Sequence, residues 1–239
     1  MIAATVALLA ASRPILHSHN DYLRDRPLHQ ALDHGFRSVE ADVFLIDGEL
    51  RVAHERENTR PGRTLESLYL EPLRTRAQEP GLDLILLVDI KAEGEAVYRE
   101  LKARLPRYPY LTRWESGRRK AGRVTVILSG DRPIETVRAE ANRWVALDGR
   151  FPDLDRELDP ELFPLVSDSW SVLGWTSGSP AAGEALDRLR SAVGKARAKG
   201  VLLRFWGVPD RPALWGQLRE EGVPVIGTDQ IEGLALFLG

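Results

Sequence analysis

Side chains that could bind a metal or transfer a proton crowd the stretch "ILHSHNDYL", residues 15–23. His17, His19, Asn20 and Asp21 follow directly on an apolar pair. Histidine changes charge near neutral pH, so it can serve as a general acid, a general base or a metal ligand. The stretch therefore indicates half of a site that other parts of the chain must complete.

Two carboxylates in "SVEADVFL" are the next candidates. Glu40 and Asp42 are two positions apart, and residues two apart on a strand point to the same face. Val39, Ala41 and Val43 then form the opposite face, which can pack under helices. The alternation predicts that both carboxylates point to one polar side of a sheet.

The segment "VDIK" repeats this device, with Asp89 and Lys91 on one face and Val88 and Ile90 on the other. Carboxylates that converge in a confined space repel one another unless a cation lies among them. Oxygen ligands suit Mg²⁺ or Ca²⁺, and Asn20 could add a neutral oxygen. An isolated ExD pair is more simply a solvated strand face, but the apolar alternation and the second strand favour a metal site.

All five histidines lie in the first quarter of the chain, at positions 17, 19, 29, 34 and 54. His29 and His34 fall on an expected helix and are predicted to be surface residues. His17 and His19 have the HxH spacing of binuclear metallohydrolases, but those enzymes need later histidines, and none follows His54. His54 follows a short strand, "GELRVAH", and is either a buried structural histidine or, with His19, one of an acid–base pair that flanks the metal.

The composition is that of a globular protein and restricts the function classes. Of 239 residues 43% are hydrophobic and 28% charged, and the formal net charge is −2, so nothing favours nucleic-acid binding. The chain has no cysteine, which excludes disulfides and thiolate metal sites. Residues 1–12, "MIAATVALLAAS", resemble a secretory signal without its positive first region and are too short to span a bilayer. Export and a cytoplasmic location both stay open.

Short apolar runs alternate with amphipathic stretches along the chain. The expected strands are residues 14–18, 38–45, 82–90, 123–129, 143–148, 163–168, 200–206 and 223–228. The expected helices are residues 27–35, 64–77, 93–105, 134–142, 180–200, 211–222 and 230–239. The basic segment 111–123 is predicted to be a helix end or an excursion, and 148–163 a loop with a helical turn.

Eight strands that alternate with helices favour parallel pairing, and eight is the number that closes a (β/α)8 TIM barrel. We therefore expect an α/β fold with a single domain over residues 13–239. Active sites of such barrels lie at the carboxyl ends of the strands. Further polar or aromatic candidates at or near these ends are Asp148, Asp168, Arg204, Trp206 and Asp229.

These motifs together resemble the phospholipase-C-like phosphodiesterase superfamily. It includes glycerophosphodiester phosphodiesterases, phosphatidylinositol-specific phospholipases C and spider sphingomyelinase D. Within it, "HSHNDYLRDRPLHQALDHGFRSVEADV" and "TLESLYLEPL" most resemble the altered-inheritance-of-mitochondria protein family and its bacterial relatives. The clear motifs cover residues 15–91, and "RFWGVPD" and "IGTDQI" extend the likeness.

The resemblance implies roles for individual residues. It implies that His19 and His54 are catalytic and that Lys91 lies near the phosphate. It implies that the metal is held by Glu40, Asp42, Asp89 and Asn20. The "PENT"-like segment that glycerophosphodiesterases carry before the ExD strand is absent, so a glycerophosphodiester substrate is not implied.

The expected function is a metal-dependent phosphoric diester hydrolase that uses one Mg²⁺ or Ca²⁺ ion and the two histidines as acid and base, through a cyclic phosphate intermediate. The alternatives are a non-catalytic protein that binds a phosphorylated ligand, and a barrel metallohydrolase with another substrate. Lys91, Arg204, Trp206 and His17 are the expected substrate-binding residues, although Trp206 could instead pack at the barrel rim. We expect a monomer that acts on a small-molecule or lipid phosphodiester.

Overall fold

The computed structural model describes residues 13–239, which form two compact units. The 19–147 unit comprises His19–Asp33 and Arg37–Leu147, and the 148–239 unit comprises Asp148–Gly239 with residues 13–18 and His34–Phe36. The signal-like segment 1–12 lies outside the described residues. The single domain expected over 13–239 stays a prediction.

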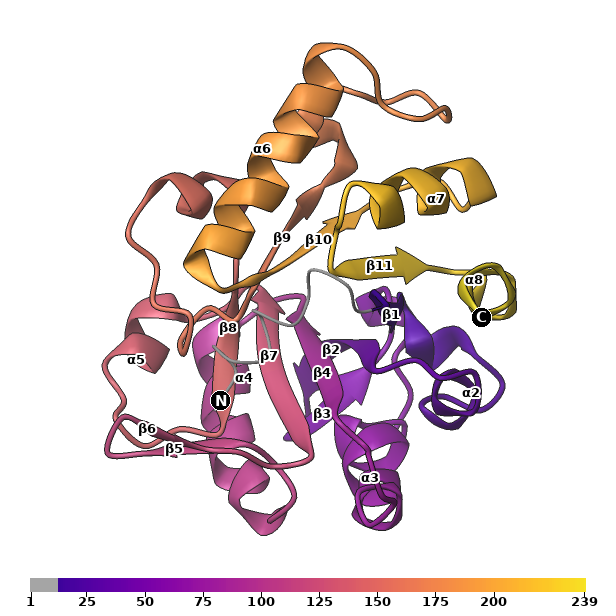
Figure 1. Ribbon diagram of the computed structural model, residues 1–239. Coiled ribbons are helices and arrows are strands. Elements are labelled where there is room, and N and C mark those ends of the chain that lie inside the picture. The colour runs from indigo at the N-terminus through magenta and orange to yellow at the C-terminus, as the bar shows by residue number, and fades with distance from the viewer. Residues whose placement is uncertain (1–12) are drawn as a thin grey trace. The chain divides into compact units, whose positions relative to one another are not determined.

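The 19–147 unit contains a sheet in the order β3-β2-β4-β7-β8 (Figure 1). Its strands pair in parallel except β2 and β3, which pair antiparallel. The strands are β2 (Ser38–Ile46), β3 (Glu49–Val52), β4 (Leu84–Ile90), β7 (Val124–Gly130) and the start of β8 (Val145–Gly149). The helices and helical turns are η1 (Asp21–Leu23), α2 (His29–Asp33), η2 (Arg56–Asn58), η3 (Glu66–Leu70), α3 (Glu71–Arg76), α4 (Gly94–Arg104), η4 (Leu105–Arg107) and α5 (Ile134–Arg138).

The 148–239 unit contains parallel strands in the order β8-β9-β10-β11-β1. They are the end of β8 with β9 (Leu165–Ser169), β10 (Leu202–Trp206), β11 (Val225–Thr228) and β1 (Ile15–Ser18). The helices and helical turns are η5 (Phe151–Asp155), η6 (Trp170–Leu173), α6 (Glu184–Lys199), α7 (Pro212–Glu220) and α8 (Ile231–Leu238).

Eight parallel strands therefore alternate with helices along the described chain, which is the element order of a (β/α)8 barrel. Each of the eight strands expected from the sequence is present, with ends shifted by a few residues. The turn expected within 148–163 is η5.

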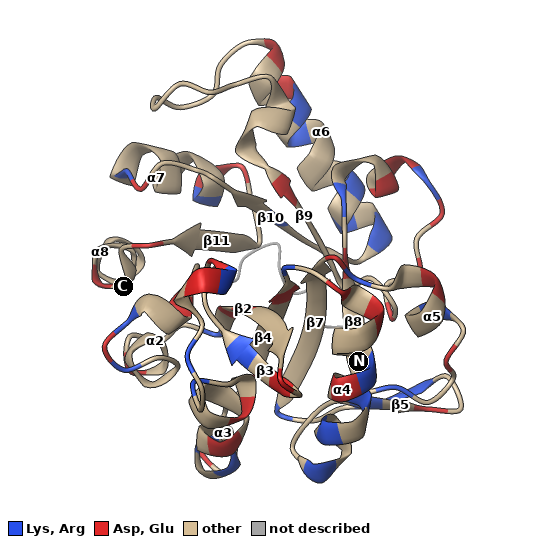
Figure 2. Cartoon of the chain, turned by 180° about the vertical axis from the view of Figure 1, so that it is seen from behind, with Lys and Arg blue, Asp and Glu red and all other residues tan. Residues whose placement is uncertain are grey.

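Of the two readings offered for residues 111–123, the helix end is wrong, and the segment is an excursion from the main sheet. This basic segment is a β-hairpin of β5 (Arg113–Glu115) and β6 (Arg118–Lys120), whose basic residues are blue in Figure 2. Ser116 and Gly117 connect the strands with φ of 51° and 73°. Two successive residues with positive φ form the turn that matches the twist of a two-stranded hairpin. Two-residue turn chemistry prevails here over the charged composition of the segment.

Local sequence signals explain how the helices begin and end. In α6 one face packs inward at three- and four-residue spacing, through Ala185, Leu189, Val193 and Ala196. Gly200 ends the helix at φ 70°, where its missing Cβ allows a left-handed cap. Pro212 at the start of α7 fits the first helical turn, where no intrahelical N–H bond is needed.

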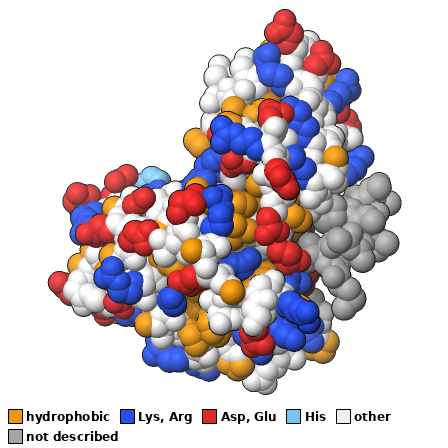
Figure 3. All heavy atoms as spheres, turned by 90° about the vertical axis from the view of Figure 1, so that its left-hand side faces the viewer, with side chains coloured by type: hydrophobic (Ala, Val, Ile, Leu, Met, Phe, Trp, Pro, Cys, Tyr) orange, Lys and Arg blue, Asp and Glu red, His pale blue; other side chains and the backbone are white. Residues whose placement is uncertain are grey.

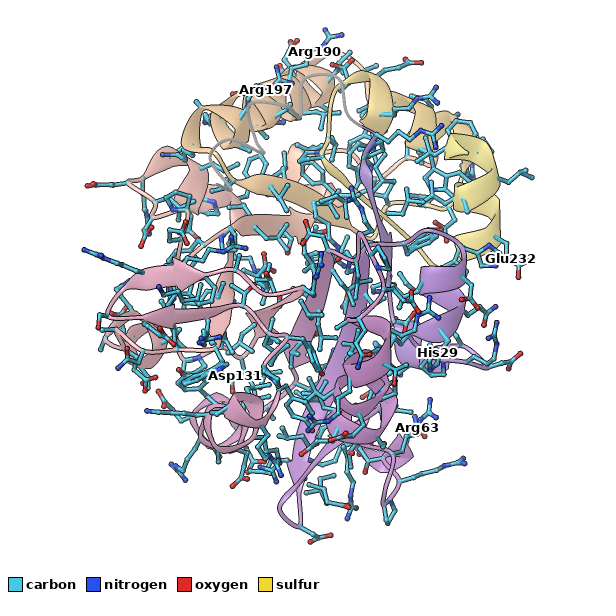
Figure 4. The ribbon with its side chains drawn as sticks, turned by 60° about the horizontal axis from the view of Figure 1, so that its bottom comes forward. His29, Arg63, Asp131, Arg190, Arg197 and Glu232 are labelled. Atoms are coloured by element: carbon cyan, nitrogen blue, oxygen red, sulfur yellow. The ribbon has the colours of Figure 1, made fainter. Side chains whose placement is uncertain are left out.

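On the face shown in Figure 3, acidic and basic side chains intermingle. Among residues 13–239, no helix combines the length and the hydrophobicity needed to cross a bilayer. Arg190 and Arg197, labelled in Figure 4, belong to the charged outer side of α6.

Candidate metal centre

Three carboxylates on neighbouring strands of the 19–147 unit form the centre of the site. Glu40 and Asp42 come from β2 and Asp89 from β4, and one potential ligand atom of each lies within 4.8 Å of the others. The parallel register pairs Asp42 directly with Asp89, so their side chains share one face of the sheet. The opposite face of β2 packs as the alternation predicts, with Val39, Ala41 and Val43 fully buried.

Burial makes this group of charges costly without a counter-ion. The exposed fraction is 1% for Asp42 and 6% for Glu40. Burial, reinforced by the charge of Glu40, raises the pKa of the Asp42 carboxyl. Asp42 Oδ1 is buried and has no hydrogen-bond partner among the described residues. A confined set of carboxylates with one bare buried oxygen fits a divalent cation with oxygen ligands.

Lys91 supplies positive charge at the end of β4. Its Nζ lies 3.2 Å from Asp42 Oδ2 and 3.2 Å from Asp89 Oδ2. Burial opposes the ammonium charge, but the two carboxylates outweigh it and raise the pKa of Lys91. The side chain is about a quarter exposed, so the ammonium group also faces solvent.

His54 is connected to the carboxylates through Asp42. It follows β3, and its Nδ1 lies 3.2 Å from Asp42 Oδ2. When Nδ1 carries the proton it donates to this carboxylate, and Nε2 is left with a free electron pair to act as a base. The side chain is 54% exposed, so His54 is not the buried structural histidine considered above.

His19 and Asn20 lie in the loop between β1 and η1. Asn20 has φ 47°, a left-handed conformation that asparagine tolerates better than most residues. Its amide Nδ2 lies 3.4 Å from His19 Nδ1, and its Oδ1 accepts a hydrogen bond of 2.8 Å from Tyr22. The histidine and the amide are therefore connected through side chains to the carboxylate group.

Tyr22 is the residue of this centre that the sequence analysis missed. Its phenol is buried and donates to Asp42 Oδ2 at 2.9 Å, while His54 Nδ1 lies 3.4 Å away. Burial and the charge of Asp42 raise the pKa of the Tyr22 hydroxyl far above its ordinary value, so it stays a donor. Its place two residues after Asn20 in "HNDY" was the available signal.

The remaining predicted site residues belong to the 148–239 unit. His17 on β1 and Arg204 on β10 are buried and lie around Gly227, where a Cβ would approach His17 Cδ2 to 3.4 Å and Arg204 Nε to 3.7 Å. Trp206 ends β10 and is 45% exposed. Their substrate-binding roles stay predictions.

The two surface histidines play no part in the carboxylate group. His34 is exposed, and its Nε2 lies 3.9 Å from Glu232. His29 begins α2 and is half-buried (Figure 4).

A solved structure shares this fold. The crystal structure of glycerophosphodiester phosphodiesterase from Agrobacterium tumefaciens aligns over 94% of this chain and 98% of its own, with a TM-score of 0.58 and 15% identity. The fold is therefore a (β/α)8 barrel, and the predicted fold class is confirmed.

Sequence comparison assigns the chain to a family within this fold. The model of the AIM6-like phosphodiesterase domain matches residues 9–80 and 76–148, and the chain belongs to this family. "Altered inheritance of mitochondria protein 6 homolog" of Arthroderma benhamiae is 32% identical over 90% of this chain and 81% of its own length. "Altered inheritance of mitochondria protein 6" of Lachancea thermotolerans is 30% identical over 92% of this chain and 64% of its own. The recognised resemblance is confirmed.

Proposed function

We propose that the chain is a divalent-cation-dependent phosphoric diester hydrolase. The observation that carries this proposal is the Asp42 carboxylate, which has one bare buried oxygen beside Glu40 and Asp89 and a second oxygen bonded to His54. A candidate cation site and a proton-transfer group are thereby adjacent, an arrangement that suits metal-assisted phosphodiester cleavage. The phosphodiesterase-type fold supports the same reaction class.

Each residue of the centre has a role that its surroundings support. Glu40, Asp42, Asp89 and the neutral oxygen of Asn20 would hold one Mg²⁺ or Ca²⁺ ion, and such an ion would supply positive charge for the phosphate oxygens. Lys91 adds fixed positive charge for the phosphate.

Two histidines transfer the protons. His54 Nε2 would remove the proton from a neighbouring hydroxyl of the substrate, or from water where the substrate has no such hydroxyl, as in bis(p-nitrophenyl) phosphate. The oxygen that loses the proton attacks phosphorus as the bond to the leaving alcohol breaks. His19 donates a proton to that leaving oxygen. Where a substrate hydroxyl attacks, the product of this step is a cyclic phosphodiester, and water opens it with the two histidines in exchanged roles.

The other proposed substrate-binding residues, His17, Arg204 and Trp206, belong to the 148–239 unit, and of the three only Trp206 is exposed. An exposed indole at a strand end can stack on a ring or cover an aliphatic group.

Hydrolysis of bis(p-nitrophenyl) phosphate tests the proposal. We expect turnover with Mg²⁺ or Ca²⁺ and none with EDTA, because the carboxylate group then lacks its cation. His54→Ala should lower kcat by about 10²–10⁴-fold, the usual contribution of general acid–base catalysis. His19→Ala should change kcat little on this substrate, because p-nitrophenolate leaves without a proton, and should show a loss of the same size on a phosphodiester with an alkyl leaving alcohol. The circular dichroism spectrum should stay that of the wild type.

His34→Ala is the matched control, since it removes an exposed histidine that lies outside the centre. A wild-type protein that binds the cation but cleaves no member of a panel of soluble and lipid phosphodiesters would show that the site binds a ligand without catalysis.

A further inference from the structure

Tyr22 connects three separate segments of the 19–147 unit. Its hydroxyl oxygen lies 2.8 Å from Asn20 Oδ1, 2.9 Å from Asp42 Oδ2 and 3.4 Å from His54 Nδ1. These partners come from the loop before η1, from β2 and from the segment after β3. The tyrosine itself is 1% exposed, so no water competes freely for these bonds.

The hydrogen bonds of Asp42 are distributed unevenly between its two oxygens. Tyr22, His54 and Lys91 all approach Oδ2, at 2.9, 3.2 and 3.2 Å. Oδ1 has no partner among the described residues although it is buried. A carboxylate held through one oxygen by three donors cannot rotate freely, and its other oxygen stays available to a cation.

Tyr22 also fixes which way the Asn20 amide points. Its hydroxyl faces Asn20 Oδ1, while Asn20 Nδ2 faces His19 Nδ1. A phenol has one proton, so it donates to Asn20 or to Asp42 at any moment, and the two acceptor oxygens share this donor in turn.

The loop that carries Tyr22 is itself anchored at several points. The Arg63 guanidinium, labelled in Figure 4, donates to the Tyr22 carbonyl. The buried Asp21 carboxylate accepts from the Leu28 amide at 2.6 Å and from the Tyr69 hydroxyl at 3.0 Å. Leu28 has φ 64°, a strained conformation that persists only where the surroundings enforce it. These hydrogen bonds restrain the backbone around Tyr22 and so hold its hydroxyl near the carboxylates.

We propose that Tyr22 is the positioning residue of the metal centre: its hydroxyl holds Asp42 and Asn20 in the orientation in which they bind the cation, with His54 beside them. The inference rests on the proposed function, and it assigns to Tyr22 no contact with substrate. Tyr22 acts through the ligands and through His54.

Tyr22→Phe removes the hydroxyl alone and tests this role. Calorimetric titration with Mg²⁺ and with Ca²⁺, without substrate, should show a Kd about 10–100-fold weaker than that of the wild type. At saturating cation, kcat on bis(p-nitrophenyl) phosphate should fall about tenfold while KM stays within about twofold, since the role is orientation of ligands and base.

Tyr98→Phe is the matched control. It removes another buried phenol, which donates to Glu140 at 2.7 Å, from the same unit. Both variants should lose a few degrees of melting temperature, but only Tyr22→Phe should weaken cation binding. Equal cation affinity in Tyr22→Phe and the wild type overturns the proposal.

A second variant and the independence of the titrations from catalysis make the test conclusive. If Tyr22→Phe does not fold, Arg63→Ala releases the Tyr22 backbone instead, with weaker cation binding expected and unchanged binding counting against the proposal. The titrations need no turnover, so an inactive wild type refutes the hydrolase alone, while the titrations still decide the role of Tyr22.

Discussion

At the scale of single residues, Asp42 should make the stability of the protein depend on pH when no metal is bound. Burial and the charge of Glu40 raise the pKa of its carboxyl, so the folded state binds this proton more tightly than the unfolded state. Between the ordinary aspartate pKa, about 3.9, and the raised value, the folded state holds more protons and stability falls as pH rises. Above this window the metal-free protein carries the full cost of the charge.

Asp42→Asn should therefore stabilise the protein in EDTA at pH 7. The amide keeps the shape of the carboxylate but removes one of the crowded charges. The melting temperature should rise by about 2–4 °C for each kcal/mol of repulsion relieved. The difference should shrink as the pH approaches 4.

Thermal unfolding in EDTA between pH 4 and 8 is the measurement, with Asp83→Asn at an exposed position as control. A wild type that is more stable than Asp42→Asn at pH 7 in EDTA would contradict this account. In saturating Mg²⁺ the order should reverse, because the amide binds a cation more weakly than a carboxylate.

The carboxylate group could be predicted from sequence because it depends on strand periodicity alone. Glu40, Asp42 and Asp89 follow from alternation on two strands, and their meeting follows from parallel register. Tyr22 could not be found in this way, because its partner Asp42 is twenty positions away and its approach depends on the left-handed Asn20. No sequence period encodes such a turn.

At the scale of elements, the packing of β7 against β4 determines how much space the Asp89 side chain has. The register pairs Ile90 with Gly130, and Gly130 has φ 66°. A Cβ at Gly130 would collide with the Ile90 carbonyl and with the Asp89 carboxylate. The glycine at the end of β7 therefore leaves room for the Asp89 carboxylate on the neighbouring strand.

Gly130→Ala should cost roughly 1–3 kcal/mol of unfolding free energy through backbone strain and steric conflict. It should also weaken cation binding, because Asp89 must move. Urea unfolding and calorimetric titration measure the two effects.

Gly194→Ala is the control, because the same substitution should here raise the unfolding free energy instead of lowering it. Gly194 lies on the exposed side of α6, and a Cβ there meets nothing within 4 Å. Alanine should raise the unfolding free energy by roughly 0.5–1 kcal/mol, the helix preference over glycine. If Gly130→Ala also proved stabilising, the steric argument would be wrong.

Elements with strong apolar periods were predictable, and the short polar ones were not. The eight strands have runs of β-branched and aliphatic residues, and α6 has a clear amphipathic period. The β5–β6 hairpin is charged and three residues long on each side, and it is stabilised by contacts remote in sequence. The backbone N–H of Trp114 donates to the Arg143 carbonyl oxygen, with an N–O distance of 2.8 Å. The Arg143 guanidinium carbon lies 3.9 Å from the Trp114 ring centroid. Tertiary contacts of this kind are not visible in a local pattern.

At the scale of the whole molecule, cation binding should raise the melting temperature of the protein. A ligand that binds only the folded state adds about 2.7 kcal/mol at one hundred times its Kd. For a chain of this length, that corresponds to a rise in melting temperature of about 5–11 °C. Thermal unfolding with increasing Mg²⁺ or Ca²⁺ measures it.

Glu40→Gln should lose most of this rise, since it removes one of the three carboxylates. Glu157→Gln, at an exposed position, should keep it. Equal shifts in the two variants would show that the cation binds elsewhere.

The shared use of Asp42 has a consequence for how such a protein can change over generations. Asp42 Oδ1 has no partner among the described residues and Oδ2 lies beside His54 Nδ1, so in the proposed function one carboxylate serves both the cation and the base. A substitution that draws Asp42 more strongly toward the ion weakens the partner of His54, and one that favours His54 loosens the ion. Mutations nearby therefore have to be selected in compensating pairs, which predicts slow, correlated drift around this aspartate.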